Sequence, residues 1–196
     1  MSLRKYSPAA DRNKSALLMV LKQALEKSGF ALVIADGTGQ HTAFFAEHFK
    51  DWTWQPTDYD TNNLISIDAW CHPHRNVKVA RQLDVRDDWP STAISAVFNA
   101  NMIHISDWST CVGLMRNGGK HLAKNQPLIL YGPFKENGVH TAPSNASFDK
   151  SLRLQNPTWG VRDLEAVEIC AQEHGLYLEN KHIMPANNLT LIFRKQ

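Results

Sequence analysis

The feature that most constrains the fold of this chain is a short apolar run that ends in a glycine turn. Residues 30–35 are Phe-Ala-Leu-Val-Ile-Ala, and Gly37-Thr38-Gly39 follow them. An amphipathic stretch with Phe44, Phe45 and Phe49 comes next. Strand, tight turn and helix in this order open a nucleotide-type site in a doubly wound sheet, because glycine lets the backbone approach a ligand and the helix start offers unpaired N–H groups.

The rest of the chain alternates between strand-like and helix-like patterns. A leucine stripe predicts a helix from residue 13 to Gly29, and Pro8 disfavours an earlier start. The helices expected after it lie at 64–70, from the cap Ser106 to 122, at 147–154 and at 164–174. The further strands are predicted at 53–57, 77–83, 96–98, 127–131, 176–184 and 189–193.

The linker between the last two strands is too short for a helical crossover, so these strands should form an antiparallel hairpin. We therefore expect an α/β fold, a doubly wound and mostly parallel sheet of seven strands with an antiparallel last strand. With 196 residues, of which 43% are hydrophobic, the chain suits one domain over 1–196. Residues 1–29 would be a helical lead-in, and 132–160 an inserted segment on the substrate side.

Composition excludes several classes of function. The net charge is +2 and the basic residues are scattered, so no nucleic acid is expected as a partner. No apolar run approaches the ~20 residues that cross a bilayer, so no membrane partner is expected. Three separated cysteines fit a reduced, cytoplasmic protein. The sequence Cys71-His72-Pro73-His74 has no second ligand pair nearby, and no metal site is predicted.

Polar residues mark the carboxyl ends of the predicted strands. The second strand ends at Asp58, the third at Asp84, and the fourth at Asn99 and Asn101. Asp58 follows Gly39 by 19 residues, which matches the ~20-residue spacing to an acidic residue that binds ribose hydroxyls. A single Asp is more often a turn or helix cap, but three polar strand ends in series favour a nucleoside site.

The glycine pattern separates two kinds of nucleoside ligand. A dinucleotide fold needs Gly-x-Gly-x-x-Gly, and neither Thr42 nor Gln40 supplies the third glycine. The turn instead resembles the acidic-x-Gly-x-Gly-x-Gly motif of class I S-adenosylmethionine-dependent methyltransferases. In this chain Val33 stands at the acidic position, and Ala35 stands at the first glycine.

Further motifs resemble the poorly characterised family of methyltransferase-like protein 26 over essentially the whole chain. They are residues 7–14, Gly-Thr-Gly-Gln-His at 37–41, 54–58, Asn-Ala-Asn-Met-Ile-His at 99–104, 130–134, 144–149 and 184–188. The resemblance implies a Rossmann-like class I methyltransferase fold. It also implies S-adenosylmethionine as the cofactor and S-adenosylhomocysteine as its product.

The same resemblance implies roles for the cofactor-binding residues. The methionine part of the cofactor would follow the turn formed by Ala35, Asp36, Gly37, Thr38 and Gly39. Asp58 would hold the ribose and Tyr59 would lie beside the adenine. Asp84 and Val85 would meet the adenine edge, and Asn99 would lie near the transferable methyl group.

Methyl transfer needs an oriented acceptor and, for some acceptors, a base. His104 is the candidate base because its ordinary pKa is near neutrality, although a loop-pinning hydrogen bond to the backbone suits it slightly better. Asn101 would orient a polar atom of the substrate. A small-molecule substrate would meet Arg12, Asn13, His140, Asn145 and Trp159, each of which also suits a structural role. Arg12 or Arg162 would suit an anionic substrate.

Three functions follow from these patterns. The first is a methyltransferase that acts on an unidentified small molecule. The second is a non-catalytic module that binds or senses S-adenosylmethionine, which Val33 at the acidic position motivates. The third is a nicotinamide-dependent oxidoreductase, against which the missing third glycine argues. The sequence leaves the oligomeric state open.

Overall fold

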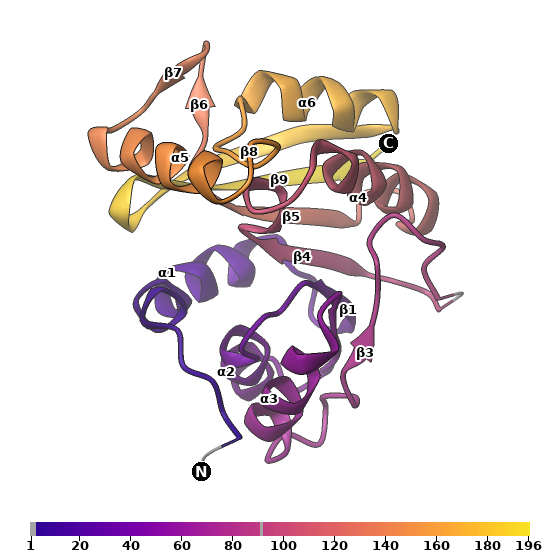
Figure 1. Ribbon diagram of the computed structural model, residues 1–196. Helices are drawn as coiled ribbons and strands as arrows, with labels where there is room; N and C mark the ends of the chain where they lie inside the picture. The colour runs from indigo at the N-terminus through magenta and orange to yellow at the C-terminus, as the bar shows by residue number, and fades with distance from the viewer. Residues whose placement is uncertain (1–2, 91) are drawn as a thin grey trace.

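The computed structural model describes residues 3–90 and 92–196, and its centre is a seven-stranded sheet with the order β3-β2-β1-β4-β5-β9-β8 (Figure 1). All neighbouring strands from β3 to β5 pair in parallel, whereas β9 is antiparallel to both β5 and β8. This is the predicted α/β fold, including its antiparallel final hairpin. The strands are β1 Gly29–Ile34, β2 Trp52–Asp58, β3 Arg81–Gln82, β4 Ala96–Ala100, β5 Pro127–Gly132, β8 Leu176–Met184 and β9 Asn188–Lys195.

Helices cover both faces of the sheet (Figure 1). Helices α1 and α2 pack on one face with Val33, Phe98 and Ile129, and α3 packs beside α2. Helices α4 and α6 pack on the other face with Leu32, Val97 and other residues of alternate register. The helices are α1 Pro8–Ala24, α2 Gln40–His48, α3 Thr61–Cys71, α4 Trp108–His121, α5 Pro143–Gln155 and α6 Leu164–Glu173, with short 3-10 turns η1 Met102–His104 and η2 Pro185–Asn187.

The chain leaves β1 toward β2 on one side, and β4 and β5 lie on the other side of β1. The order of the strands therefore reverses between β1 and β4. In open α/β sheets, ligands bind outside the carboxyl ends of the strands at such a reversal. A ligand site is therefore expected between the glycine turn after β1 and the residues after β4.

Three predicted boundaries differ from the structure. Helix α1 begins at Pro8, because proline suits the first helical position and the Ser7 hydroxyl accepts a hydrogen bond from the Ala10 N–H. Strand β3 is much shorter than 77–83, because side chains bind its backbone: Gln55 donates to the Val79 carbonyl and Asp68 accepts from the Ala80 N–H. Helix α4 is capped by Asp107 rather than Ser106.

Residues 132–160 contain a small hairpin, β6 Lys135–Glu136 with β7 Val139–His140, followed by α5. The Asn145 amide of α5 donates to the Asn187 carbonyl in η2, which holds α5 against the β8–β9 connection. Within residues 3–90 and 92–196 no helix combines the length and the apolar character that a membrane crossing requires. The same residues include no group of three or more His, Cys, Asp or Glu side chains arranged to hold a metal ion.

Candidate functional site at the carboxyl edge of the sheet

The turn after β1 adopts left-handed backbone at three positions: Ala35 with φ 53°, Gly37 with φ 65° and Gly39 with φ 91°. The first of these conformations favours glycine, so Ala35 occupies its position under strain. The Asp58 carboxylate fixes the turn by accepting a hydrogen bond of 2.8 Å from the Gly37 N–H. The glycine turn and Asp58 therefore form one structural unit, in which the carboxylate holds the turn in place.

The two glycines have different surroundings. A Cβ atom at Gly39 would lie 2.6 Å from the Ile67 Cα in α3, whereas a Cβ atom at Gly37 would meet nothing within 4 Å. Gly39 thus permits the close approach of two backbone segments. Gly37 borders open space.

Asp36 is the unusual residue of the turn. Its side chain is 9% exposed, and neither carboxylate oxygen has a hydrogen-bond partner of good geometry among the described residues. Burial raises the pKa of Asp36 to about 7, the nearby Thr42 opposes this rise in part, and the charge of Asp58 adds to it. A buried, unpaired carboxyl is costly for the free protein and suits a cationic group of a ligand.

Three cavities lie in a row along this edge of the sheet. We call them the strand-end cavity, of about 420 Å³, the turn cavity, of about 200 Å³, and the outer cavity, of about 320 Å³. The strand-end and turn cavities share walls at Ile34, Ala35, Gly37, Ala100 and Ile105. The turn and outer cavities share Ala9, Asn13 and Asn101. An elongated ligand could therefore extend from one cavity into the next.

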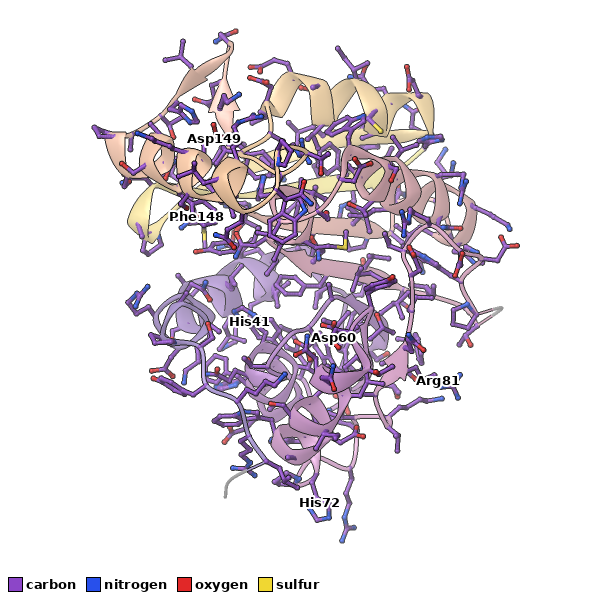
Figure 2. The ribbon with its side chains drawn as sticks, viewed as in Figure 1. His41, Asp60, His72, Arg81, Phe148 and Asp149 are labelled. Atoms are coloured by element: carbon purple, nitrogen blue, oxygen red, sulfur yellow. The ribbon has the colours of Figure 1, made fainter. Side chains whose placement is uncertain are left out.

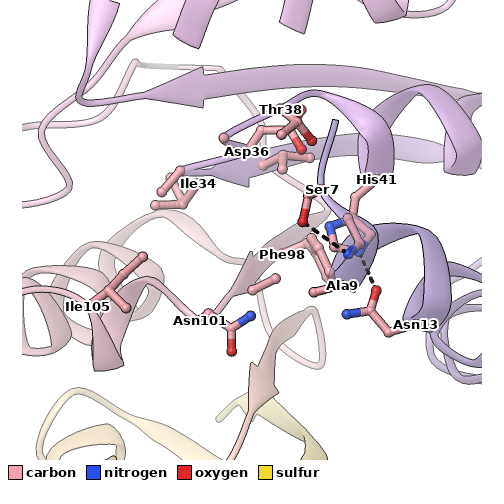
Figure 3. A pocket seen from close by; sticks show the side chains of 15 residues that line it. Ser7, Ala9, Asn13, Ile34, Asp36, Thr38, His41, Phe98, Asn101 and Ile105 are labelled. Atoms are coloured by element: carbon pink, nitrogen blue, oxygen red, sulfur yellow. Dashed lines mark hydrogen bonds between the residues drawn. The ribbon is translucent and has the colours of Figure 1, made fainter. Parts of the chain in front are cut away.

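The turn cavity lies between the glycine turn and the start of α1. Figure 3 shows Asp36 and Thr38 on one side of it and Asn13 and Asn101 on the other. Burial lowers the pKa of His41 to about 4, so its ring is neutral, and Nε2 donates a hydrogen bond of 2.6 Å to the Asn13 Oδ1. This bond fixes the Asn13 amide at the boundary with the outer cavity.

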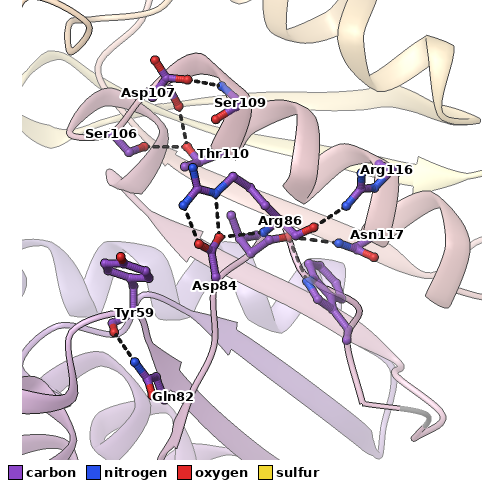
Figure 4. Close-up of polar contacts among 12 residues, drawn as sticks. Tyr59, Gln82, Asp84, Arg86, Ser106, Asp107, Ser109, Thr110, Arg116 and Asn117 are labelled. Carbon is purple, nitrogen blue, oxygen red and sulfur yellow. Dashed lines mark hydrogen bonds and ion pairs between the residues drawn. The ribbon is translucent and has the colours of Figure 1, made fainter.

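The strand-end cavity is lined by all four residues predicted to bind ribose and adenine: Asp58, Tyr59, Asp84 and Val85. Asp58 is buried, and besides the Gly37 N–H it accepts from the Asp60 N–H and from the Asn63 amide. The Asp84 carboxylate is paired with the Arg86 guanidinium, whose hydrogen bond lowers the pKa of Asp84 (Figure 4). Trp159, predicted to meet the substrate, also lines this cavity.

The outer cavity brings together four of the residues predicted to meet the substrate, Arg12, Asn13, Asn101 and Asn145. Asn101 holds left-handed backbone with φ 65°, and its N–H donates to the Tyr131 carbonyl. Phe148 also lines the cavity, and Figure 2 shows it on the side of α5 that is turned toward α1. The outer cavity is thus enclosed by α1, η2 and α5 around the end of β5.

Four predicted site residues line none of the three cavities: Gly39, which packs against α3, and His104, Asn99 and His140. His104 is 0% exposed, its pKa falls to about 3 on burial, and its Nδ1 accepts from the Arg162 N–H at 3.3 Å. This geometry corresponds to loop pinning rather than to a base. Asn99 is buried and donates to the Ile34 carbonyl, which ties β4 to β1. His140 lies 3.7 Å from the Asp149 carboxylate and lines none of the three cavities.

Sequence reasoning missed residues that reach the site from distant elements. The Gln40 side chain accepts from the Ser7 N–H, which holds the N-terminal segment over the turn cavity. His41 fixes Asn13, and Tyr131 and Pro185 line the outer cavity beside Phe148, an aromatic residue of the segment that was expected on the substrate side. The only signal for Gln40 and His41 was their place in the 37–41 motif. Tyr131 and Pro185 were marked only by their place in the motifs at 130–134 and 184–188. Those motifs do not show that the two side chains meet at one cavity, because their proximity depends on tertiary packing.

Comparisons with known proteins give one family match and several similar structures. A family model described as "Protein of unknown function (DUF938)" matches residues 4–195. The structure resembles an O-methyltransferase family 2 protein from Planctomyces limnophilus in complex with apigenin (TM-score 0.77, 17% identity, 96% of this chain and 58% of that chain). It also resembles the mitomycin 7-O-methyltransferase MmcR (0.78, 13%, 93% and 54%) and the S-adenosylhomocysteine-bound methyltransferase CalO1 of calicheamicin biosynthesis (0.75, 14%, 93% and 54%).

At these identities the likeness shows the fold, which is that of the class I methyltransferases. The chain spans a little over half the length of the solved structures that it matches.

Proposed function

The chain belongs to the DUF938 family, whose description assigns no activity, and we propose from its site that the protein is an S-adenosylmethionine-dependent methyltransferase acting on a small molecule. The observation that carries this proposal is the joined pair of strand-end and turn cavities. Their walls include the glycine turn, the carboxylate of Asp58, which is predicted to bind ribose, and the unpaired carboxyl of Asp36. The bound S-adenosylhomocysteine of CalO1, a structural neighbour, supports the same cofactor.

The residues present fit this cofactor at both of its ends. In the turn cavity, the unpaired Asp36 carboxyl suits the ammonium group of the methionine part, in place of the carboxylate that Val33 does not provide. In the strand-end cavity, Tyr59 and Val85 would contact the adenine, and Asp58 retains acceptor capacity for a ribose hydroxyl. Asp84 is already paired with Arg86, and this ion pair fixes the side chain in the cavity wall. Its carboxylate would still accept a hydrogen bond from the adenine amino group.

When bound, the cofactor would supply a methyl group carried on a positively charged sulfur, and this sulfur would be the leaving group. The protein residues orient the two reactants and keep water out. Asn101 borders both the turn cavity and the outer cavity, so its amide lies where cofactor and acceptor would meet. His41 assists by holding the Asn13 amide on the same boundary.

We further propose that the protein is related to methyltransferase-like protein 26. This relation rests in part on the Asn-Ala-Asn-Met-Ile-His string at 99–104 and the Gly-Thr-Gly-Gln-His string at 37–41. Asn101 of the first string and Gly37, Thr38 and His41 of the second line the turn cavity. We also propose that residues 1–196 act as one domain. The free cysteines Cys71, Cys111 and Cys170 suit a reducing compartment such as the cytoplasm.

Binding of a ligand panel tests the proposal. Isothermal titration would use S-adenosylmethionine, S-adenosylhomocysteine, NAD and NADP with the same protein preparation. We expect heat and a raised melting temperature with the first two ligands and neither effect with the nicotinamide cofactors. Binding of NAD or NADP alone, or of none of the four, would contradict the proposal.

A non-catalytic cofactor-binding module is the second candidate, and Val33 at the acidic position favours it. The outer cavity distinguishes the two functions, because a sensor needs no acceptor space beside the sulfur. Incubation with labelled S-adenosylmethionine and a small-molecule cell extract separates them. A labelled methylated product identifies an enzyme, whereas cofactor binding without any product identifies a sensor.

A further inference from the structure

The outer cavity has a distinctive charge. Among the described residues that line it, Arg12 is the single ionised side chain, and the other polar groups are amides and hydroxyls. No hydrogen bond or ion pair occupies the Arg12 guanidinium within the described part of the chain. Arg162 is already engaged, since its side chain donates to the Ile103, Ser106 and Thr158 carbonyls. Arg12 is therefore the cation available to an acceptor.

The same cavity provides no proton acceptor of suitable strength. Its described lining residues include no Asp, Glu, His, Cys or Lys. Two imidazoles beside its walls are engaged elsewhere. His41 donates to Asn13, and His104 is fully buried with its Nδ1 accepting from the Arg162 N–H. The Asp36 carboxyl lines the turn cavity, on the cofactor's side of Asn101. Nothing that lines the outer cavity would take a proton from an alcohol or an ammonium ion.

The balance of methyl transfer connects these two observations. When the acceptor is an anion, the acceptor–carbon bond forms, the sulfur–carbon bond breaks and its electron pair stays on sulfur. The positive charge of the donor and the negative charge of the acceptor cancel, and no proton moves. A neutral alcohol or an amine in its ammonium form would instead have to release a proton to a base.

We infer, resting on the proposed methyltransferase function, that the outer cavity receives a small acceptor that is already anionic at neutral pH, such as a carboxylate or a thiolate. Arg12 attracts its charge, and Phe148 and Tyr131 contact its apolar part. The methylated product is neutral and loses the attraction of Arg12. The same residue therefore favours entry of the acceptor and departure of the product.

Ligand-observed NMR on protein saturated with S-adenosylhomocysteine tests this inference. The probes are matched sets that share a skeleton and differ in charge. The first set is benzoate, benzamide, benzylamine and methyl benzoate, and the second is the corresponding phenylacetate set. Thiophenol is paired with its methylated form, thioanisole. We expect the anions to bind about tenfold more tightly than the amide, the amine and the methyl ester. The substitution Arg12→Gln should remove most of this preference, and the melting temperature of the variant verifies its fold.

Arg75→Gln is the matched control, because Arg75 is an exposed arginine in the loop after α3 and lines none of the three cavities. It should leave the preference for anions unchanged. Equal binding of acid and amide, equal effects of the two substitutions, or no binding by any probe would overturn the inference while leaving the cofactor proposal intact. Failure of S-adenosylhomocysteine to bind in the first step would instead overturn the proposed function itself.

Discussion

At the scale of single residues, Val33 and Asp36 show what a motif does and does not predict. The motif identified Val33 as the position without its usual carboxylate. It could not show that Asp36, three residues later, places an unpaired carboxyl in the wall of the turn cavity. That fact depends on the left-handed backbone at Ala35 and Gly37, which determines the direction of the side chain between them. A positive charge on the ligand would relieve the cost of burying this group.

Asp36→Asn tests this role directly. The substitution preserves shape and removes the charge, so affinity for S-adenosylhomocysteine should fall by roughly tenfold or more. Affinity for 5′-methylthioadenosine, which lacks the amino-acid part, should change little. Isothermal titration of both ligands with both proteins gives the comparison. An equal loss for the two ligands would mean that Asp36 supports the whole site rather than the ammonium group.

The same substitution has a predicted effect on stability. Because the pKa of Asp36 is raised to about 7 in the folded state, folding favours its protonated form, and stability is lost as pH rises from about 4 through 7. Relative to the wild type, Asp36→Asn should therefore be similar near pH 4 and more stable by a few kcal/mol at pH 8. Urea unfolding across this range measures the difference. The titratable groups around Asp36 are present in both proteins: Asp58 and Cys71 interact with its charge, and His41 lines the same cavity.

At the scale of elements, the sequence predicted the type of most elements and misplaced some ends. Leucine spacing identified α1, but its start depends on the Ser7 cap and on Pro8 at the first helical position. The third strand was predicted over the whole of 77–83 and is much shorter. The side chains of Gln55 and Asp68 bind its backbone instead, and no local pattern reveals contacts between such distant residues.

The glycine turn gives an element-scale prediction through its two glycines. Gly39→Ala should destabilise the protein by several kcal/mol, because the added Cβ meets the Ile67 backbone at 2.6 Å in a left-handed conformation. Gly37→Ala has space for its Cβ, so it should cost only about 1 kcal/mol of backbone strain.

The added methyl at Gly37 borders both cofactor cavities, so Gly37→Ala should weaken S-adenosylhomocysteine binding although the protein folds. Thermal melts of the two variants, followed by titration of the folded one, measure both effects. Similar stability of the two variants would contradict the packing described at Gly39. Full affinity in Gly37→Ala would contradict the place of the ligand.

At the scale of the whole molecule, the alternation of strands and helices and the short final linker were sufficient to predict the sheet and its hairpin. Asp58 and Asp84 were predicted at a nucleoside site because parallel strands bring their carboxyl ends to one edge, and the resemblance to methyltransferases added the other cofactor residues. The outer cavity was less accessible to such reasoning. Its walls come from α1, β5, α5 and η2, and their meeting depends on packing such as the Asn145 amide bond to Asn187.

A crystal structure with S-adenosylhomocysteine tests the central claim most directly, because the claim is one of place and direction. We predict adenine beside Tyr59 and Val85, the ammonium group on Asp36 and the sulfur facing Asn101 and the outer cavity. Density for the ligand in the reverse direction, or at a site outside the strand-end and turn cavities, would contradict the account.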